Sequence, residues 1–81
     1  MKAKIYISYK EGILDPQGKI VGTSLASIGV EGINKVSIGK YIEMEFLDHL
    51  SKKDIKKITE KACKELLANP NTETYKFEII E

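Results

Sequence analysis

The sequence predicts one α+β domain in which a four-stranded antiparallel sheet carries two helices on one face. Three observations support this prediction. The chain has only 81 residues, which is the length of a single domain, here 1–81. Several short segments alternate apolar and polar residues, as half-buried strands do. Two further segments repeat apolar residues at the spacing of a helix face.

Four strands are expected along the chain. The first covers Ala3–Tyr9, a second and less regular one covers Gly32–Gly39, and a third covers Lys40–Leu47. The junction Gly39-Lys40 has two interpretations: a tight hairpin with Gly39 at positive φ, or one long bent strand. The last strand is expected over 74–80, where aromatic and aliphatic residues again occupy every second position.

Two helices are expected between these strands. Asp15 can accept hydrogen bonds from the free N–H groups of a helix start, and Pro16 suits the first helical position. Two glycines weaken this helix unless it lies close to another backbone, and Gly29 is expected to end it. The second helix begins at Ser51 in a sequence that resembles a capping box, and it ends before Pro70.

The order strand, helix, strand, strand, helix, strand (βαββαβ) is that of the split βαβ, or ferredoxin-like, two-layer sandwich. Right-handed crossovers would place both helices on one face of the sheet. The opposite face would then be polar and mixed in charge, with two tyrosines. Its residues would be Lys4, Tyr6, Ser8, Tyr41, Glu43, Glu45, Lys76 and Glu78.

Charge and hydropathy exclude several classes of function. The chain has 13 basic and 12 acidic residues, a formal net charge of +1, which gives no broad attraction to nucleic acid or to an anionic membrane. An RNA-binding surface is further disfavoured by two glutamates on the strand over Lys40–Leu47. No apolar run reaches the roughly 20 residues of a membrane helix. No apolar h-region follows Lys2 and Lys4, so a cytoplasmic location is expected.

The residues that usually carry catalysis are scarce. All 13 basic residues are lysine, and tryptophan is absent. The single histidine, His49, is expected in a solvated loop, and the single cysteine, Cys63, is expected to be a buried helix residue. No phosphate-binding loop or set of metal ligands is present. A self-contained enzyme could still use Lys, Asp or Glu, and no metal site is expected.

The segment Lys10–Gly18 is the most unusual part of the chain. It combines a strand-to-helix turn with a strong helix start, whose free N–H groups could bind an anion. A well-capped helix is the simpler interpretation. Because the predicted fold hosts many unrelated functions, the fold alone leaves the function open.

Three motifs in register resemble one family. The first is Leu14-Asp15-Pro16-Gln17-Gly18, preceded by Lys10-Glu11 and Ile13. The second is Gly39-Lys40-Tyr41-Ile42-Glu43, and the third is Leu66–Pro70 followed by Glu73 and Tyr75. Their order and spacing resemble the PurS family, the small subunit of phosphoribosylformylglycinamidine (FGAM) synthase. The chain departs from the family pattern at Asn71-Thr72, where an apolar pair is common.

The resemblance implies a subunit of a larger enzyme in purine biosynthesis. In this family a PurL synthetase binds ATP and magnesium, a PurQ glutaminase releases ammonia, and PurS bridges the two and aids ammonia transfer. It thus implies no catalytic residue and no cofactor on this chain, and partners of the PurL and PurQ types. Unpaired sheet edges also predict a dimer, or a dimer of dimers. The residues expected to contact partners are Lys10, Asp15, Gln17, Gly18, Lys40, Tyr41, Glu43 and Asn69. A stand-alone regulatory module that binds a small ligand is the alternative.

Overall fold

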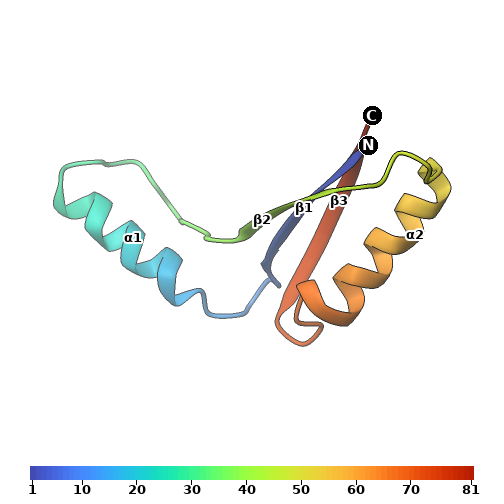
Figure 1. Cartoon of the computed structure of the whole chain (residues 1–81). Coiled ribbons are helices and arrows are strands. Elements are labelled where there is room, and N and C mark those ends of the chain that lie inside the picture. Colours follow the sequence, from blue (N-terminus) through green and yellow to red (C-terminus); the bar gives the residue numbers. More distant parts are fainter.

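The structure, a computed structural model, describes the whole chain, residues 1–81. Its sheet is antiparallel throughout, with β1 in the centre between β2 and β3. A π-helical turn, η1, extends the second helix (Figure 1). The elements in chain order are β1 (Lys2–Tyr9), α1 (Pro16–Ser27), β2 (Lys40–Glu45), α2 (Lys52–Ala62), η1 (Cys63–Leu67) and β3 (Glu73–Ile80).

The sheet has three strands, so the predicted four-stranded ferredoxin-like sandwich is wrong. The missing strand is the one expected over Gly32–Gly39. Residues 31–39 form no strand and run directly into β2 (Figure 1). The hairpin at Gly39 is also wrong, because the glycines at positive φ are Gly12, Gly29 and Gly32. The alternative of one long strand is closer, although strand pairing begins only at Lys40.

α1 does not cover the sheet, so the prediction of two helices on one face is also wrong. Figure 1 shows α1 standing away from the three strands, beside the connection that returns to β2. The chain is therefore elongated, with extents of 51 × 26 × 14 Å. Its radius of gyration is 16.2 Å, whereas a compact domain of this length has a value of about 12 Å. We call residues 13–39, which include α1, the arm.

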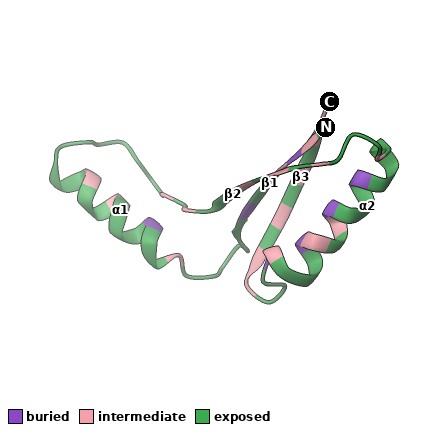
Figure 2. Ribbon diagram, in the orientation of Figure 1, coloured by how far each residue is buried: buried purple, intermediate pink, exposed green.

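The core lies between the sheet and α2. The inward side chains of β1 are fully or almost fully buried and contact Cys63 and Ala68. Ile55 and Thr59 of α2 are buried as well, and the Thr59 hydroxyl donates to the Ile55 carbonyl oxygen at 2.8 Å. Only 8 of 81 residues are buried, and just one of them, Gly18, lies in the arm (Figure 2). The core therefore stabilises the sheet and α2, whereas the arm has almost no buried residues of its own.

The register of the sheet sets which residues share an end. Lys2 lies opposite Ile80 at one end, and Tyr9 lies opposite Glu73 at the other. The two chain termini therefore meet at the same end of the sheet (Figure 1). The turn that enters the arm and the turn that enters β3 meet at the opposite end.

Candidate interaction surfaces

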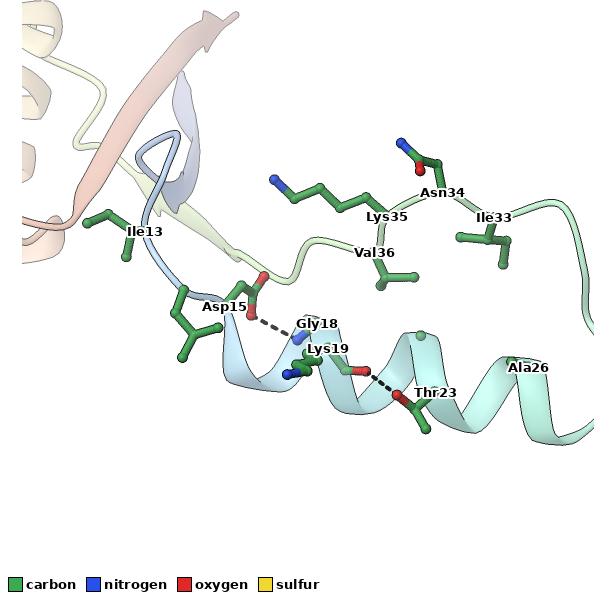
Figure 3. A pocket seen from close by; sticks show the side chains of 12 residues that line it. Ile13, Asp15, Gly18, Lys19, Thr23, Ala26, Ile33, Asn34, Lys35 and Val36 are labelled. Carbon is green, nitrogen blue, oxygen red and sulfur yellow. Dashed lines mark hydrogen bonds between the residues drawn. The ribbon is translucent and has the colours of Figure 1, made fainter.

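Asp15 fixes the start of the arm. Its Oδ1 atom accepts a hydrogen bond from the Gly18 N–H at 2.8 Å, which confirms the predicted helix cap (Figure 3). Its Oδ2 atom accepts a second bond from the Ile38 N–H at 2.7 Å. These two backbone bonds, that from Ile38 first, lower the pKa of the Asp15 carboxyl. One carboxylate thus ties the N-terminus of α1 to the residue just before β2.

Gly18 lets the two halves of the arm approach. A Cβ atom at Gly18 would lie 2.3 Å from the Val36 carbonyl oxygen, so only glycine fits. One turn later, a Cβ atom at Gly22 would lie 3.6 Å from Cγ2 of Val36, which is an ordinary contact. A groove of about 600 Å³ follows this contact along α1 and residues 33–36 (Figure 3). Of the two glycines expected to weaken α1, Gly18 thus serves close backbone packing, whereas Gly22 leaves room for a side chain.

The three sequence motifs meet at the end of the sheet away from the termini. Lys10 donates from Nζ to the Pro70 carbonyl oxygen at 2.6 Å. Glu73 accepts from the Asn69 N–H at 2.8 Å, and its other oxygen lies 3.8 Å from Lys40 Nζ. Lys10, Lys40 and Asn69 come from three separate motifs. We call the region of Lys10, Gln17, Lys40, Asn69 and Glu73 the motif junction.

The motif junction contains a polar groove of about 540 Å³. A hollow of about 50 Å³, lined in part by Gln17, Lys40 and Glu73, lies next to it. The Glu73 side chain is only 13% exposed, whereas that of Lys40 is 61% exposed. A long ion pair with an exposed lysine contributes little to stability. Lys40 can therefore turn toward a partner without loss to the fold.

Tyr41 and Glu43 lie elsewhere, on the helix-free face of the sheet. The Tyr41 hydroxyl donates to Glu43 Oε1 at 2.8 Å, and Lys2 Nζ lies 3.4 Å from the same atom. The Tyr6 and Tyr41 rings pack with their centroids 5.2 Å apart. The Tyr6 hydroxyl donates to Glu78 at 3.3 Å. The predicted polar face is thus present as an ordered network, on β1, β2 and β3 together.

The carboxylates fix the protonation of this face. Partial desolvation first, and then the hydrogen bond to Glu43, raise the pKa of Tyr41 to about 12. The same hydrogen bond, together with the Lys2 charge, lowers the pKa of the Glu43 carboxyl. At neutral pH Tyr41 is therefore a donor and Glu43 an acceptor. Tyrosines held in this way are typical of protein interfaces, where they add contact area at small entropic cost.

The structure thus brings four of the eight predicted contact residues, Lys10, Gln17, Lys40 and Asn69, together at the motif junction. Asp15 and Gly18 lie at the start of the arm, and Tyr41 and Glu43 lie on the helix-free face. The prediction missed Glu73 as a site residue, although Glu73 belongs to the third motif. It also missed Val36 and Ile38, which act through backbone atoms. Backbone contacts leave no side-chain signal in a sequence. Whether any of these residues contacts a partner stays a prediction.

Other chemical groups form no cluster. No group of three or more His, Cys, Asp or Glu side chains is placed to hold a metal ion. Cys63 is buried, as predicted, and burial raises the pKa of its thiol. His49 lies exposed in the turn before α2, also as predicted. No helix is long and apolar enough to cross a membrane.

The chain is thus a small α+β protein with a polar junction of motifs, an ordered tyrosine-carboxylate face and an arm outside the core, three surfaces that suit contacts with other chains. The family model described as "PurS: Phosphoribosylformylglycinamidine (FGAM) synthase" matches residues 2–81. The chain belongs to the PurS family. Its function is therefore that of a subunit of FGAM synthase, in purine biosynthesis.

The relatives cover nearly the whole chain. The PurS subunit of Bacillus subtilis is 39% identical over 80 residues, which are 99% of this chain and 93% of the relative. That of Synechocystis is 37% identical over 76 residues, covering 94% and 75% of the two chains. A solved structure of Bacillus subtilis PurS superposes with a TM-score of 0.86 over 99% of this chain and 98% of that chain. This agreement over the full length includes the arm.

One of the similar structures is a complex. A chain in the structure of PurLQS from Thermotoga maritima is 27% identical to this protein and superposes with a TM-score of 0.79. The match covers 98% of this chain and 95% of that chain.

Proposed function

We propose that this chain is the non-catalytic small subunit that bridges a PurL-type synthetase and a PurQ-type glutaminase and aids ammonia transfer between them. The observation that carries the proposal is the full-length likeness to a chain of the Thermotoga maritima PurLQS complex. In this proposal ATP, magnesium and glutamine bind to the other subunits, and the complex works in the cytoplasm. The chain itself acts as one domain and self-associates.

The motif junction is the surface that we assign to the other subunits. Its groove exposes the Lys40 ammonium and the Leu66 side chain, which is 82% exposed at the rim. A mixed polar and apolar rim of this kind suits a directional contact between proteins. Asp15 and Gly18 hold the arm in place, so their role there is positioning rather than contact.

Reconstitution tests the bridging role. The PurL-type and PurQ-type proteins of the same organism are mixed with ATP, Mg²⁺ and either glutamine or ammonium, with and without this chain. FGAM formation from glutamine should require the chain, because ammonia must pass between two subunits, and formation from ammonium should depend on it less. Full glutamine-dependent activity without the chain would refute the proposal.

A matched pair of variants locates the contact. Lys40→Ala should weaken assembly with the two partners by at least tenfold, because it removes the exposed charge of the motif junction. Lys56→Ala, on the exposed side of α2, should leave assembly unchanged. Equal behaviour of both variants would place the contact elsewhere.

The alternative function is a stand-alone module that binds a small ligand. The groove of about 600 Å³ beside α1 favours it, because this size lies in the range of small-molecule sites. Calorimetric titration of the isolated chain with glutamine and with adenine nucleotides separates the two functions. Micromolar binding by the isolated chain would support the module, and no binding would support the bridging role.

A further inference from the structure

The turn that leads into β3 has its hydrogen-bond acceptors engaged within the chain. The Asn69 carbonyl oxygen accepts from the N–H groups of Thr72 and Glu73, at 3.2 and 2.7 Å. The Pro70 carbonyl oxygen accepts from Lys10 Nζ at 2.6 Å, and that of Thr72 accepts from the Lys10 N–H at 2.8 Å. The Glu73 carboxylate accepts from the Asn69 N–H. The acceptors of this turn are therefore satisfied before any partner arrives.

The side-chain donors beside this turn are in the opposite condition. The Asn69 side-chain oxygen accepts from the Asn71 N–H at 2.9 Å, which fixes the amide and leaves its NH₂ group without a partner in the chain. The Lys40 ammonium has three N–H donors and only the long contact of 3.8 Å with Glu73. Both groups border the polar groove of about 540 Å³. A surface with spare donors and engaged acceptors fits a group that only accepts, as an ionised carboxylate does.

An exposed apolar side chain borders the same groove. Leu66 is 82% exposed, whereas the next residue, Leu67, packs against the core. Both belong to η1, which is closed by a bond from the Ala68 N–H to the Cys63 carbonyl oxygen at 3.1 Å. This wider turn directs Leu67 to the core and leaves Leu66 beside the groove. Single π-helical turns of this kind are frequent at functional sites.

We propose that the motif junction binds an aspartate or glutamate side chain of a partner subunit through the Lys40 ammonium and the Asn69 NH₂ group, with an apolar neighbour of that side chain packed on Leu66. This inference rests on the proposed function and names the chemistry of the partner segment. The Lys40 ammonium can face the partner carboxylate and Glu73 at once, because it has three donors. A hydrogen bond between charged groups is stronger than one between neutral groups.

Two carboxylates of this chain also border the groove. That of Glu73 is only 13% exposed and accepts from the Asn69 N–H, so it faces Lys40 from within the fold. That of Glu65 is exposed. Because like charges repel, Glu65 opposes an acidic partner side chain, and removal of its charge should strengthen the contact.

Substitutions at Asn69 and Lys40 test the sign of the partner's charge. Asn69→Asp keeps an oxygen for the Asn71 N–H but puts a negative charge where the NH₂ donors were. It should weaken assembly with the PurL-type and PurQ-type proteins at least tenfold at low salt and less at high salt, because salt screens repulsion. Lys40→Gln should also weaken assembly at least tenfold, whereas Lys40→Arg keeps the charge and should stay within about threefold of the wild type. Sedimentation velocity of the mixed proteins gives the dissociation constants.

Three further variants serve as comparison and control. Glu65→Gln should strengthen assembly by about twofold at low salt, because it removes a repulsion. Leu66→Ala should weaken assembly by about tenfold at low and high salt alike, since an apolar contact is not screened. The matched control Lys56→Gln, on the exposed side of α2, should leave the dissociation constant unchanged. Each variant should keep the urea midpoint of the wild type, because every altered side chain is exposed.

Three outcomes would overturn the inference. Tighter assembly of Asn69→Asp would mean a cationic partner group, and equal dissociation constants of Lys40→Gln and Lys40→Arg would mean that the charge is not recognised. A changed oligomeric state of the isolated Lys40→Gln variant would make a second copy the occupant. In each case, glutamine-dependent FGAM synthesis that still requires the wild-type chain would leave the bridging role intact. Synthesis that does not require the chain would instead refute the proposed function itself.

Discussion

The two helices of this protein have opposite relations to their own chain. α2 carries seven charged residues among eleven and buries Ile55 and Thr59 against the sheet. α1 carries one charged residue among twelve and buries only Gly18. The position of α2 is therefore set by the core of its own chain. The position of α1 is set by the hydrogen bonds of Asp15 and by the close contact of Gly18 with Val36, outside the core.

The largest expected effect is on the α2 side of this comparison. Ile55→Ala should lower the free energy of unfolding by about 2–5 kcal/mol, because it leaves a cavity in the core. Ile20→Ala, in the exposed stripe of α1, should lower it by less than about 0.5 kcal/mol in dilute solution. Urea unfolding at low micromolar concentration measures both. A larger loss for Ile20→Ala would mean that α1 is packed within one chain.

A pair of glycine variants tests the packing inside the arm. Gly18→Ala should destabilise the arm by about 1–3 kcal/mol, because the new methyl group overlaps the Val36 carbonyl oxygen. Gly22→Ala meets only ordinary contacts, and it should stabilise α1 by about 0.5–1 kcal/mol through higher helix propensity. Hydrogen exchange of the amides in 16–27 reports each change. The same response in both variants would contradict the close approach at Gly18.

The two hydrogen bonds that Asp15 accepts predict that stability depends on pH. These hydrogen bonds lower the pKa of the folded carboxyl below its ordinary value of 3.8. The two hydrogen bonds therefore contribute fully to the free energy of unfolding above about pH 4, and this contribution is lost as the pH falls through the folded pKa. Asp15→Asn should lower the unfolding midpoint at pH 7, and the difference from the wild type should shrink toward pH 2. A difference that stays constant with pH would argue against an ionised Asp15 that accepts these hydrogen bonds.

The smallest effect belongs to the charged surface that α2 shares with η1. Lys64→Ala removes an ion pair with Glu60 at 3.7 Å in which the lysine is 66% exposed. The expected change in the free energy of unfolding is below about 0.5 kcal/mol, because water screens the pair. Urea unfolding at low and high salt should give nearly the same value. A loss above 1 kcal/mol would show that the charged side of α2 is more than solvated surface.

The success of sequence-based prediction follows the same division. β1, the start of α1 at Asp15-Pro16, the start of α2 at Ser51 and the last strand were all predicted, because each depends on local chemistry. The strand count was wrong because Gly32–Gly39 has strand composition but no partner strand in its own chain. Composition indicates that a segment can pair, and only the surroundings decide whether it does.

The candidate site also depends on surroundings that the sequence does not reveal. The predicted contact residues Lys10, Lys40 and Asn69 lie near one another in the structure, although they lie far apart in the chain. Their contact with a partner stays a prediction. The second role of Asp15 was not predicted, because its bond to Ile38 joins residues 23 positions apart through a backbone N–H. The π-helical turn at Cys63–Leu67 likewise has no signal in the sequence.

The meeting of both termini at one end of the sheet has a practical consequence. Lys2 and Ile80 are direct neighbours, and the motif junction lies at the far end of the same strands. A tag, a dye or a second protein joined to either terminus therefore sits a full strand length, about 25 Å, from the junction. A short linker could also join the terminus of one copy to that of another molecule without crossing the surfaces on which this subunit depends.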